Sequence, residues 1–197
     1  MGNGTIRSVS SGEGVAKAAL IFPFHPIAGF RILHRDASIA VAIMVAVFFS
    51  AVYSLARVSS YGLAGKDVLD VIFSFAVVWI ESILHFVVLV LISVLLIKGG
   101  SARRADVASN TRLVGYWYAW NFSLSAALVV FEQDNFAVQL VLTFAIFAWF
   151  ACLYAFAMST ANGISLRRGA IYGICALLIT AYALSFGWLL LDILSIT

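Results

Sequence analysis

The sequence predicts an all-α integral membrane protein, with five transmembrane helices preceded by a short amphipathic helix. Hydrophobic residues make up 63% of the 197 residues and charged residues only 11%, whereas about a quarter of a soluble domain is charged. Apolar runs of roughly 20 residues, enough for a helix to cross a bilayer, recur along the chain. The runs are unbroken rather than short and alternating, which favours helices over a membrane β-barrel.

The first 36 residues precede the predicted membrane domain and differ from it in character. Residues 1–18 are rich in Gly and Ser and are expected to form a flexible tail. Residues 19–36 are interrupted by Pro23 and Pro26, so they lack the continuous apolar core of a signal peptide. From Pro26 onward, apolar and basic residues alternate at helical spacing. We therefore expect 19–36 to be an amphipathic segment that lies on the cytoplasmic membrane surface.

The predicted membrane domain covers residues 37–192 and is followed by a short tail, 193–197. Its five expected spans are 38–55, 70–97, 113–131, 136–158 and 169–191. The second is longer than required, because about 42 Å of helix would cross about 30 Å of hydrocarbon, so we expect it to tilt or to begin in the headgroup layer. A short link predicts that the third and fourth spans form an antiparallel hairpin. The GxxxG spacing of Gly169 and Gly173 indicates close packing within the chain.

The distribution of Lys and Arg orients the five predicted spans. Ten of the twelve basic residues fall on the side of the N-terminus, and the other side holds Arg57 and Lys66. Because cytoplasmic loops are enriched in Lys and Arg, we expect the N-terminus in the cytoplasm and the C-terminus on the opposite side. The membrane would be the inner membrane of a prokaryote or a Golgi or ER-type membrane of a eukaryote. The net charge of +3 is too small to indicate a nucleic-acid partner.

Glu81 and His85 form an acid–base pair that lies well inside a predicted span. Spaced four residues apart, they share one face of the second predicted helix. An ionisable pair within a membrane indicates a proton or cation relay, with Glu81 carrying charge and His85 titrating near neutral pH. The alternative is a structural pair whose members satisfy each other and a neighbouring helix. The sequence leaves both interpretations open.

Metal, cofactor and catalytic sites are not predicted. A zinc site needs three or four ligands, and the remaining histidines, His25 and His34, belong to the N-terminal segment. Enzyme motifs such as GxSxG, the P-loop and GxGxxG are not found. An aromatic run at 116–120 is typical of a belt at the membrane interface, with a quinone or pigment pocket as the alternative. We therefore expect a protein that is not an enzyme and binds no cofactor.

Four sequence features together resemble the Yip domain family over residues 20–192. They are a His-Pro followed by an amphipathic stretch, a second span that carries a His and runs into Lys-Gly-Gly, an aromatic run, and a polar turn after the fourth span: HPIAGFRIL at 25–33, KGG at 98–100, YWYAW at 116–120 and ANGISLRRGA at 161–170. The resemblance implies a five-span helical protein that recruits or organises partners, as eukaryotic Yip proteins do with Rab GTPases in Golgi and vesicle traffic. The Asp-Leu-Tyr-Gly-Pro type motif of the eukaryotic N-terminus is not present in this chain, so its compact form looks more like the prokaryotic members.

The preferred functional hypothesis is a non-enzymatic membrane scaffold or assembly protein of the Yip type. Its partners would be the lipid bilayer, other membrane proteins and, as an option, further copies of itself. Basic residues are expected to contact these partners or anionic lipid headgroups: Arg31, Arg35, Lys98, Arg103, Arg104, Arg112, Arg167 and Arg168. One alternative is a small proton or cation transporter or channel that uses Glu81 and His85. Another is an accessory subunit of a respiratory or photosynthetic complex, which differs from the scaffold only in its partner.

Overall fold

A computed structural model describes residues 11–60, 67–100, 106–130 and 136–195 of the chain. Within these ranges the chain folds into seven helices: α1 (Ser11–Ile21), α2 (Pro26–Asp36), α3 (Ile39–Ser60), α4 (Val68–Gly100), α5 (Val107–Val130), α6 (Phe136–Asn162) and α7 (Leu166–Ser195). The all-α prediction is therefore confirmed for the described residues. Each of the five expected spans overlaps one of the helices α3 to α7, and each of these helices is longer than the span predicted for it.

Three helices of the described chain are long and apolar enough to cross a membrane, namely Ile39–Ser60, Val68–Gly100 and Val138–Asn162. Within an 18-residue apolar window of each helix, only 22%, 39% and 28% of the residues, respectively, are buried inside the protein. Many large apolar side chains of these helices are exposed, among them Met44, Leu91 and Phe144, an arrangement that is stable in lipid and unfavourable in water. The chain is thus a membrane-embedded protein.

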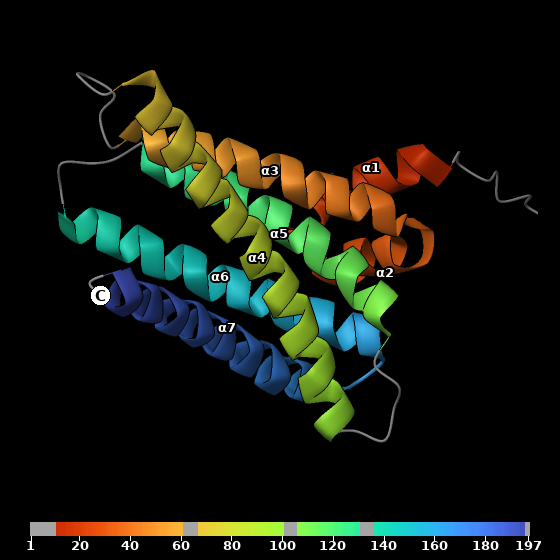
Figure 1. The fold of residues 1–197 in the computed structure, drawn as a ribbon. Helices are drawn as coiled ribbons and strands as arrows, with labels where there is room; N and C mark the ends of the chain where they lie inside the picture. Colours follow the sequence, from red (N-terminus) through yellow and green to blue (C-terminus); the bar gives the residue numbers. More distant parts are fainter. Residues whose placement is uncertain (1–10, 61–66, 101–105, 131–135, 196–197) are drawn as a thin grey trace, which may run out of the picture.

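Successive helices from α3 to α7 alternate in direction, and α4 crosses the others obliquely (Figure 1). α3, α5 and α7 begin at the end of the bundle where α2, α4 and α6 finish. We call this end of the bundle the basic end. It contains Asp36 and Gly100, the last residues of α2 and α4, Asp106, which precedes α5, and residues 162–168, where α6 ends and α7 begins. α5 lies inside the bundle, where it contacts α2, α3, α4 and α6. The side chains of α5 are therefore surrounded by protein on several sides.

The N-terminal helices α1 and α2 pack on each other and on α5. The prediction of a flexible tail through residue 18 is wrong for 11–18, which belong to α1. Phe22, between the two helices, is fully buried, and its ring lies 4.7 Å from that of Phe30. The indole Nε1 of Trp120 donates a hydrogen bond of 2.7 Å to the Ala19 carbonyl. The contacts with Phe30 and with Trp120 of α5 order the α1 segment, although its Gly and Ser content alone favours disorder.

Gly29 allows α2 to approach the turn that precedes it. A Cβ atom built on Gly29 would overlap the Cβ of Phe22 and lie 2.7 Å from its Cα. Any larger residue at this position would push the buried Phe22 away from α2. The same kind of approach occurs at Gly169 of α7, where a Cβ would lie 2.6 Å from the Ala155 carbonyl oxygen of α6. The predicted close packing of the GxxxG segment within the chain is therefore confirmed at Gly169.

The aromatic run of α5 is part of the protein core. Tyr116, Trp117 and Tyr118 are only 4%, 3% and 2% exposed, so the prediction of a belt facing the membrane interface is wrong for these three residues. Trp117 packs against α6, where its Nε1 donates a 2.9 Å hydrogen bond to the Phe150 carbonyl. The run is enclosed because α5 has neighbours on several sides, a property that does not show in the composition of the run.

Candidate functional site

Glu81 and His85 lie near the middle of α4, and both side chains are half-buried. They interact electrostatically with each other, as their spacing of one helical turn predicts. The His85 ring meets the ring of Tyr118 edge-on, with the centroids 5.8 Å apart and the planes at 77°. α5 therefore adds a phenol to the pair that the sequence placed on one helix.

Tyr118 connects this polar centre to the rest of the bundle. Its hydroxyl donates a hydrogen bond of 3.2 Å to the Ser82 carbonyl of α4, and its ring packs against Phe122, with the centroids 4.4 Å apart. The carboxylate of Glu81 is close enough to act on Tyr118 electrostatically. Sequence reasoning missed Tyr118, because it stands in an aromatic run and only the packing of α5 on α4 brings it beside Glu81 and His85.

Further polar contacts tie α4 to its neighbours at other levels. The hydroxyls of Ser93 and Tyr154 are hydrogen-bonded at 2.5 Å, and both residues are fully buried. Towards the opposite end of α4, the indole Nε1 of Trp79 donates a 3.0 Å hydrogen bond to the Ser50 hydroxyl of α3. α4 is thus joined to α3, α5 and α6 by side-chain hydrogen bonds, the contacts that hold helices together where both lipid and protein are apolar.

A buried amide pair joins α5 and α6 at the basic end. The Asn110 Nδ2 donates to the Asn162 Oδ1 at 2.9 Å, and the Asn162 Nδ2 donates back to the Asn110 Oδ1 at 3.1 Å. The two residues are 0% and 8% exposed. Each amide also donates to its own helix, Asn110 to the Asp106 carbonyl and Asn162 to the Met158 carbonyl, both at 2.9 Å. Sequence reasoning did not single out this pair, because 52 residues separate its members.

Asp106 caps the N-terminus of α5. Its carboxylate accepts hydrogen bonds of 3.1 Å from the backbone N–H groups of Ala108 and Ser109, together with a bond from the Ser109 hydroxyl. These bonds satisfy donors that the first helical turn leaves free. The hydrogen bond from the Ser109 hydroxyl, reinforced by the two backbone N–H groups and by the charge of Arg112, lowers the pKa of Asp106 below its ordinary value.

Arg112 links α5 to the end of α2. Its Nη1 donates a 2.7 Å hydrogen bond to the His34 carbonyl oxygen. The Arg112 Nε and the His34 Nδ1 are buried nearby and have no hydrogen-bond partner. Arg112 was predicted to contact headgroups or partners, and the structure places one arm of its guanidinium inside the protein.

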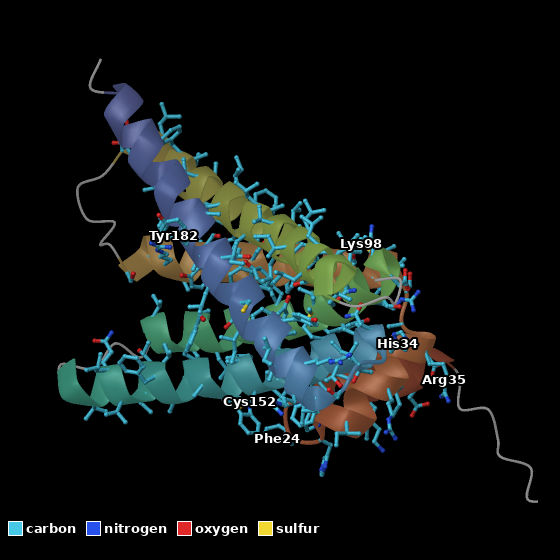
Figure 2. All side chains as sticks on the ribbon, turned by 90° about the horizontal axis from the view of Figure 1, so that it is seen from below. Phe24, His34, Arg35, Lys98, Cys152 and Tyr182 are labelled. Carbon is cyan, nitrogen blue, oxygen red and sulfur yellow. The ribbon has the colours of Figure 1, made fainter. Side chains whose placement is uncertain are left out.

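The other predicted basic contacts are exposed at the basic end, except for two that lie outside the described residues, Arg103 and Arg104. Figure 2 shows Lys98 and Arg35 at this end, with His34 beside Arg35. The exposed side chains are Arg31, Arg35, Lys98, Arg167 and Arg168. Arg35 forms an ion pair with Asp36 through two hydrogen bonds, Nε to Oδ1 at 2.7 Å and Nη2 to Oδ2 at 2.9 Å. The hydrogen bond from Arg35 lowers the pKa of the Asp36 carboxyl.

Comparisons with protein-family profiles, with curated proteins and with solved structures found no match for this chain. Among the described residues, no group of three or more His, Cys, Asp or Glu side chains is arranged to hold a metal ion. Any functional assignment must therefore come from the geometry of the bundle and the distribution of its charges.

Proposed function

We propose that the chain is a five-span, non-catalytic membrane scaffold whose basic end lies in the cytoplasm and organises anionic lipids or membrane-protein partners. The observation that carries the proposal is the charge distribution along the bundle. Among the eight described Lys and Arg residues, five stand within about two helical turns of the basic end, namely Arg35, Lys98, Arg112, Arg167 and Arg168. Lys17 and Arg31 belong to the N-terminal helices α1 and α2, and Arg57 stands near the opposite end of α3. Each cation near a negatively charged leaflet contributes about 1 kcal/mol of attraction.

The packing of α5 and α7 supports five spans. α5 is less apolar than α3, α4 and α6, and its Tyr and Trp side chains find hydrogen-bond partners inside the bundle. α7 packs along α6 and α4 and exposes apolar side chains over its described length, including Ile171 at 52% and Leu178 at 60%. Both arrangements suit helices that cross a bilayer together with α3, α4 and α6.

The N-terminal helices supply a surface for the membrane interface. The chain around the α1–α2 turn exposes large apolar side chains, with Leu20 67%, Phe24 72% and Ile27 53% exposed. α2 continues with the exposed cations Arg31 and Arg35. Apolar residues followed by basic residues on a short helix are typical of segments that lie in the headgroup layer. The resemblance to the Yip family adds the hypothesis that this end recruits membrane-protein partners.

Native mass spectrometry of the protein extracted with its lipids tests the proposal directly. We expect co-purified membrane proteins or anionic lipids, and we expect the double variant Arg167→Gln/Arg168→Gln to reduce them. Arg57→Gln removes a cation from the opposite end and is the matched control. Tags at the two termini test the span number, because five spans place them on opposite sides of the membrane. A chain that is recovered alone, or termini on one side, would contradict the proposal.

A second candidate function is proton or cation transport through the centre of the bundle. It is favoured by the edge-on contact of the Tyr118 ring with His85 and by the position of Glu81 one helical turn before His85 on the same face of α4. In liposomes that contain a pH-sensitive dye, a transporter would leak protons, and Glu81→Gln would stop the leak. Asp70→Asn, which removes an exposed carboxylate from the first turn of α4, is the matched control. The remaining alternative is an accessory subunit of a larger respiratory or photosynthetic complex. In that case the native mass spectrometry described above would show the other subunits of the complex bound to the chain.

A further inference from the structure

An apolar cavity of about 750 Å³ lies between α1, α3 and α5, at the side of the bundle where the N-terminal helices dock. One face of each of these helices lines it. On α3 the lining residues include Val41, Val45 and Phe49, which are one helical turn apart and therefore share a face. The cavity thus runs along α3 rather than across it.

The cavity has a polar end at the basic end of the bundle. Asp36 and Ser38, which stand just before α3, line it together with the apolar residues that follow. From Ser38 to Phe49 the chain rises about 16 Å along α3. Half of a bilayer core is about 15 Å thick. The apolar part of the cavity therefore has the length of a single leaflet, with its polar end at the level of the headgroups.

A polar group within the cavity wall lacks a partner. Tyr116 lines the cavity and is only 4% exposed, yet its hydroxyl has no hydrogen-bond partner. Buried hydroxyls are normally hydrogen-bonded. The neighbouring Gly115 packs against Ala42 of α3, one turn beyond Ser38. Tyr116 thus lies just below the polar end of the cavity, but its hydroxyl oxygen is shielded from the cavity itself.

The charges at the mouth match a headgroup that carries both an ammonium and a phosphate. Arg35 uses Nε and one Nη in its ion pair with Asp36, so its other N–H groups remain for a phosphate oxygen. The Asp36 carboxylate has lone pairs beyond the two that Arg35 occupies, and these can accept N–H groups of a primary ammonium. A trimethylated ammonium has no N–H to donate.

We propose that the cavity binds one phospholipid of the phosphatidylethanolamine type from the leaflet at the basic end. One acyl chain lies along the α3 face, the ammonium donates to Asp36, and a phosphate oxygen accepts N–H groups of Arg35. The proposal rests on the membrane placement proposed above, but its readout is the retained lipid rather than co-purified proteins. Wild-type protein that shows no preference between the lipids but still co-purifies with protein partners would therefore overturn this inference alone.

The test uses the full chain in nanodiscs that contain equal amounts of palmitoyl-oleoyl phosphatidylethanolamine and palmitoyl-oleoyl phosphatidylcholine. Native mass spectrometry after activation should show one retained phosphatidylethanolamine per chain, with a several-fold preference over phosphatidylcholine. Val41→Trp fills the cavity and should remove the retained lipid. Met44→Trp is the matched control, since Met44 lies three residues further along α3, is 61% exposed and does not line the cavity.

Two milder variants separate the contacts without filling the cavity. Asp36→Asn should abolish the preference between the two lipids, and Tyr116→Phe, which keeps the shape of the side chain and removes a hydroxyl shielded from the cavity, should leave retention of both unchanged. Equal retention in Val41→Trp and Met44→Trp would overturn the proposal. So would wild-type protein that holds the two lipids in the supplied ratio, or a retained molecule with the mass of a different lipid class.

Discussion

Removal of the Asn162 side chain tests how α6 is held to α5 at the basic end. Asn162→Ala breaks both amide–amide hydrogen bonds, 2.9 and 3.1 Å long, and leaves the buried Oδ1 of Asn110 without that partner. An unsatisfied buried polar group costs about 1–3 kcal/mol, whereas polar contacts between membrane helices average about 0.6 kcal/mol. Because both residues are almost fully buried, we expect a loss of about 1–2 kcal/mol in the free energy of unfolding.

A double-mutant cycle isolates the pair from other effects of the substitution. The free energies of unfolding of wild type, Asn110→Ala, Asn162→Ala and the double variant are measured by titration with SDS in mixed micelles, followed by far-UV circular dichroism. We expect the double variant to lose less than the sum of the single variants, with a coupling of about 1 kcal/mol. Ser185→Ala, which removes an exposed hydroxyl bonded within α7, should change stability by less than about 0.5 kcal/mol. Strict additivity of the two Asn substitutions would refute the reasoning.

Three further outcomes follow from contacts elsewhere in the bundle. The pKa of Asp106 is lower in the folded protein than its ordinary 3.8, so its stabilising contribution is present above about pH 4 and is lost as the pH falls through the folded pKa. The acid unfolding of Asp106→Asn should therefore show a shallower pH dependence than that of the wild type. Asp106→Ala, which also removes the helix cap, should cost about 1 kcal/mol of the free energy of unfolding. Gly29→Ala should displace Phe22 and speed hydrogen exchange in α1 and α2 while α3 to α7 stay protected, and unchanged exchange would show that the close approach is not required. Tyr154→Phe should cost about 1 kcal/mol in the SDS titration, because Ser93 loses its partner on α6; an unaltered midpoint would contradict that bond.

Helix positions were the most predictable property of this chain. In the apolar runs of α3, α4 and α6, about 20 consecutive residues would lie in lipid, where backbone N–H and C=O groups can hydrogen-bond only with one another. Each run therefore forms a helix whatever its neighbours are. The helical nature and the approximate position of these elements follow from composition alone. The N-terminal segment was less predictable, because Ser11–Ile21 is helical in a structure where Phe22 and Ala19 dock on Trp120.

The polar contacts between helices were predictable only where both partners stand on one helix. Glu81 and His85 met this condition, since a spacing of four residues places them on one face. Tyr118 joins them from α5, and the Asn110–Asn162 bond joins residues on different helices. An aromatic run such as Tyr116 to Tyr118 has the same composition whether it faces the membrane interface or the core. Its burial follows from the position of α5 among α2, α3, α4 and α6.

The sequence by itself determined that this is a helical membrane protein and assigned ten of its twelve cations to one side of the predicted spans. Both follow from local physics, because backbone hydrogen bonds and the cost of charge in hydrocarbon act on each segment independently. Tertiary structure alone decided which helix lies inside, which polar groups meet, and where a cavity opens beside α3. In lipid the outer surface and the core are equally apolar, so no hydrophobic periodicity marks the buried face of a helix. Only the packing of small, aromatic and hydrogen-bonding side chains against one another selects it.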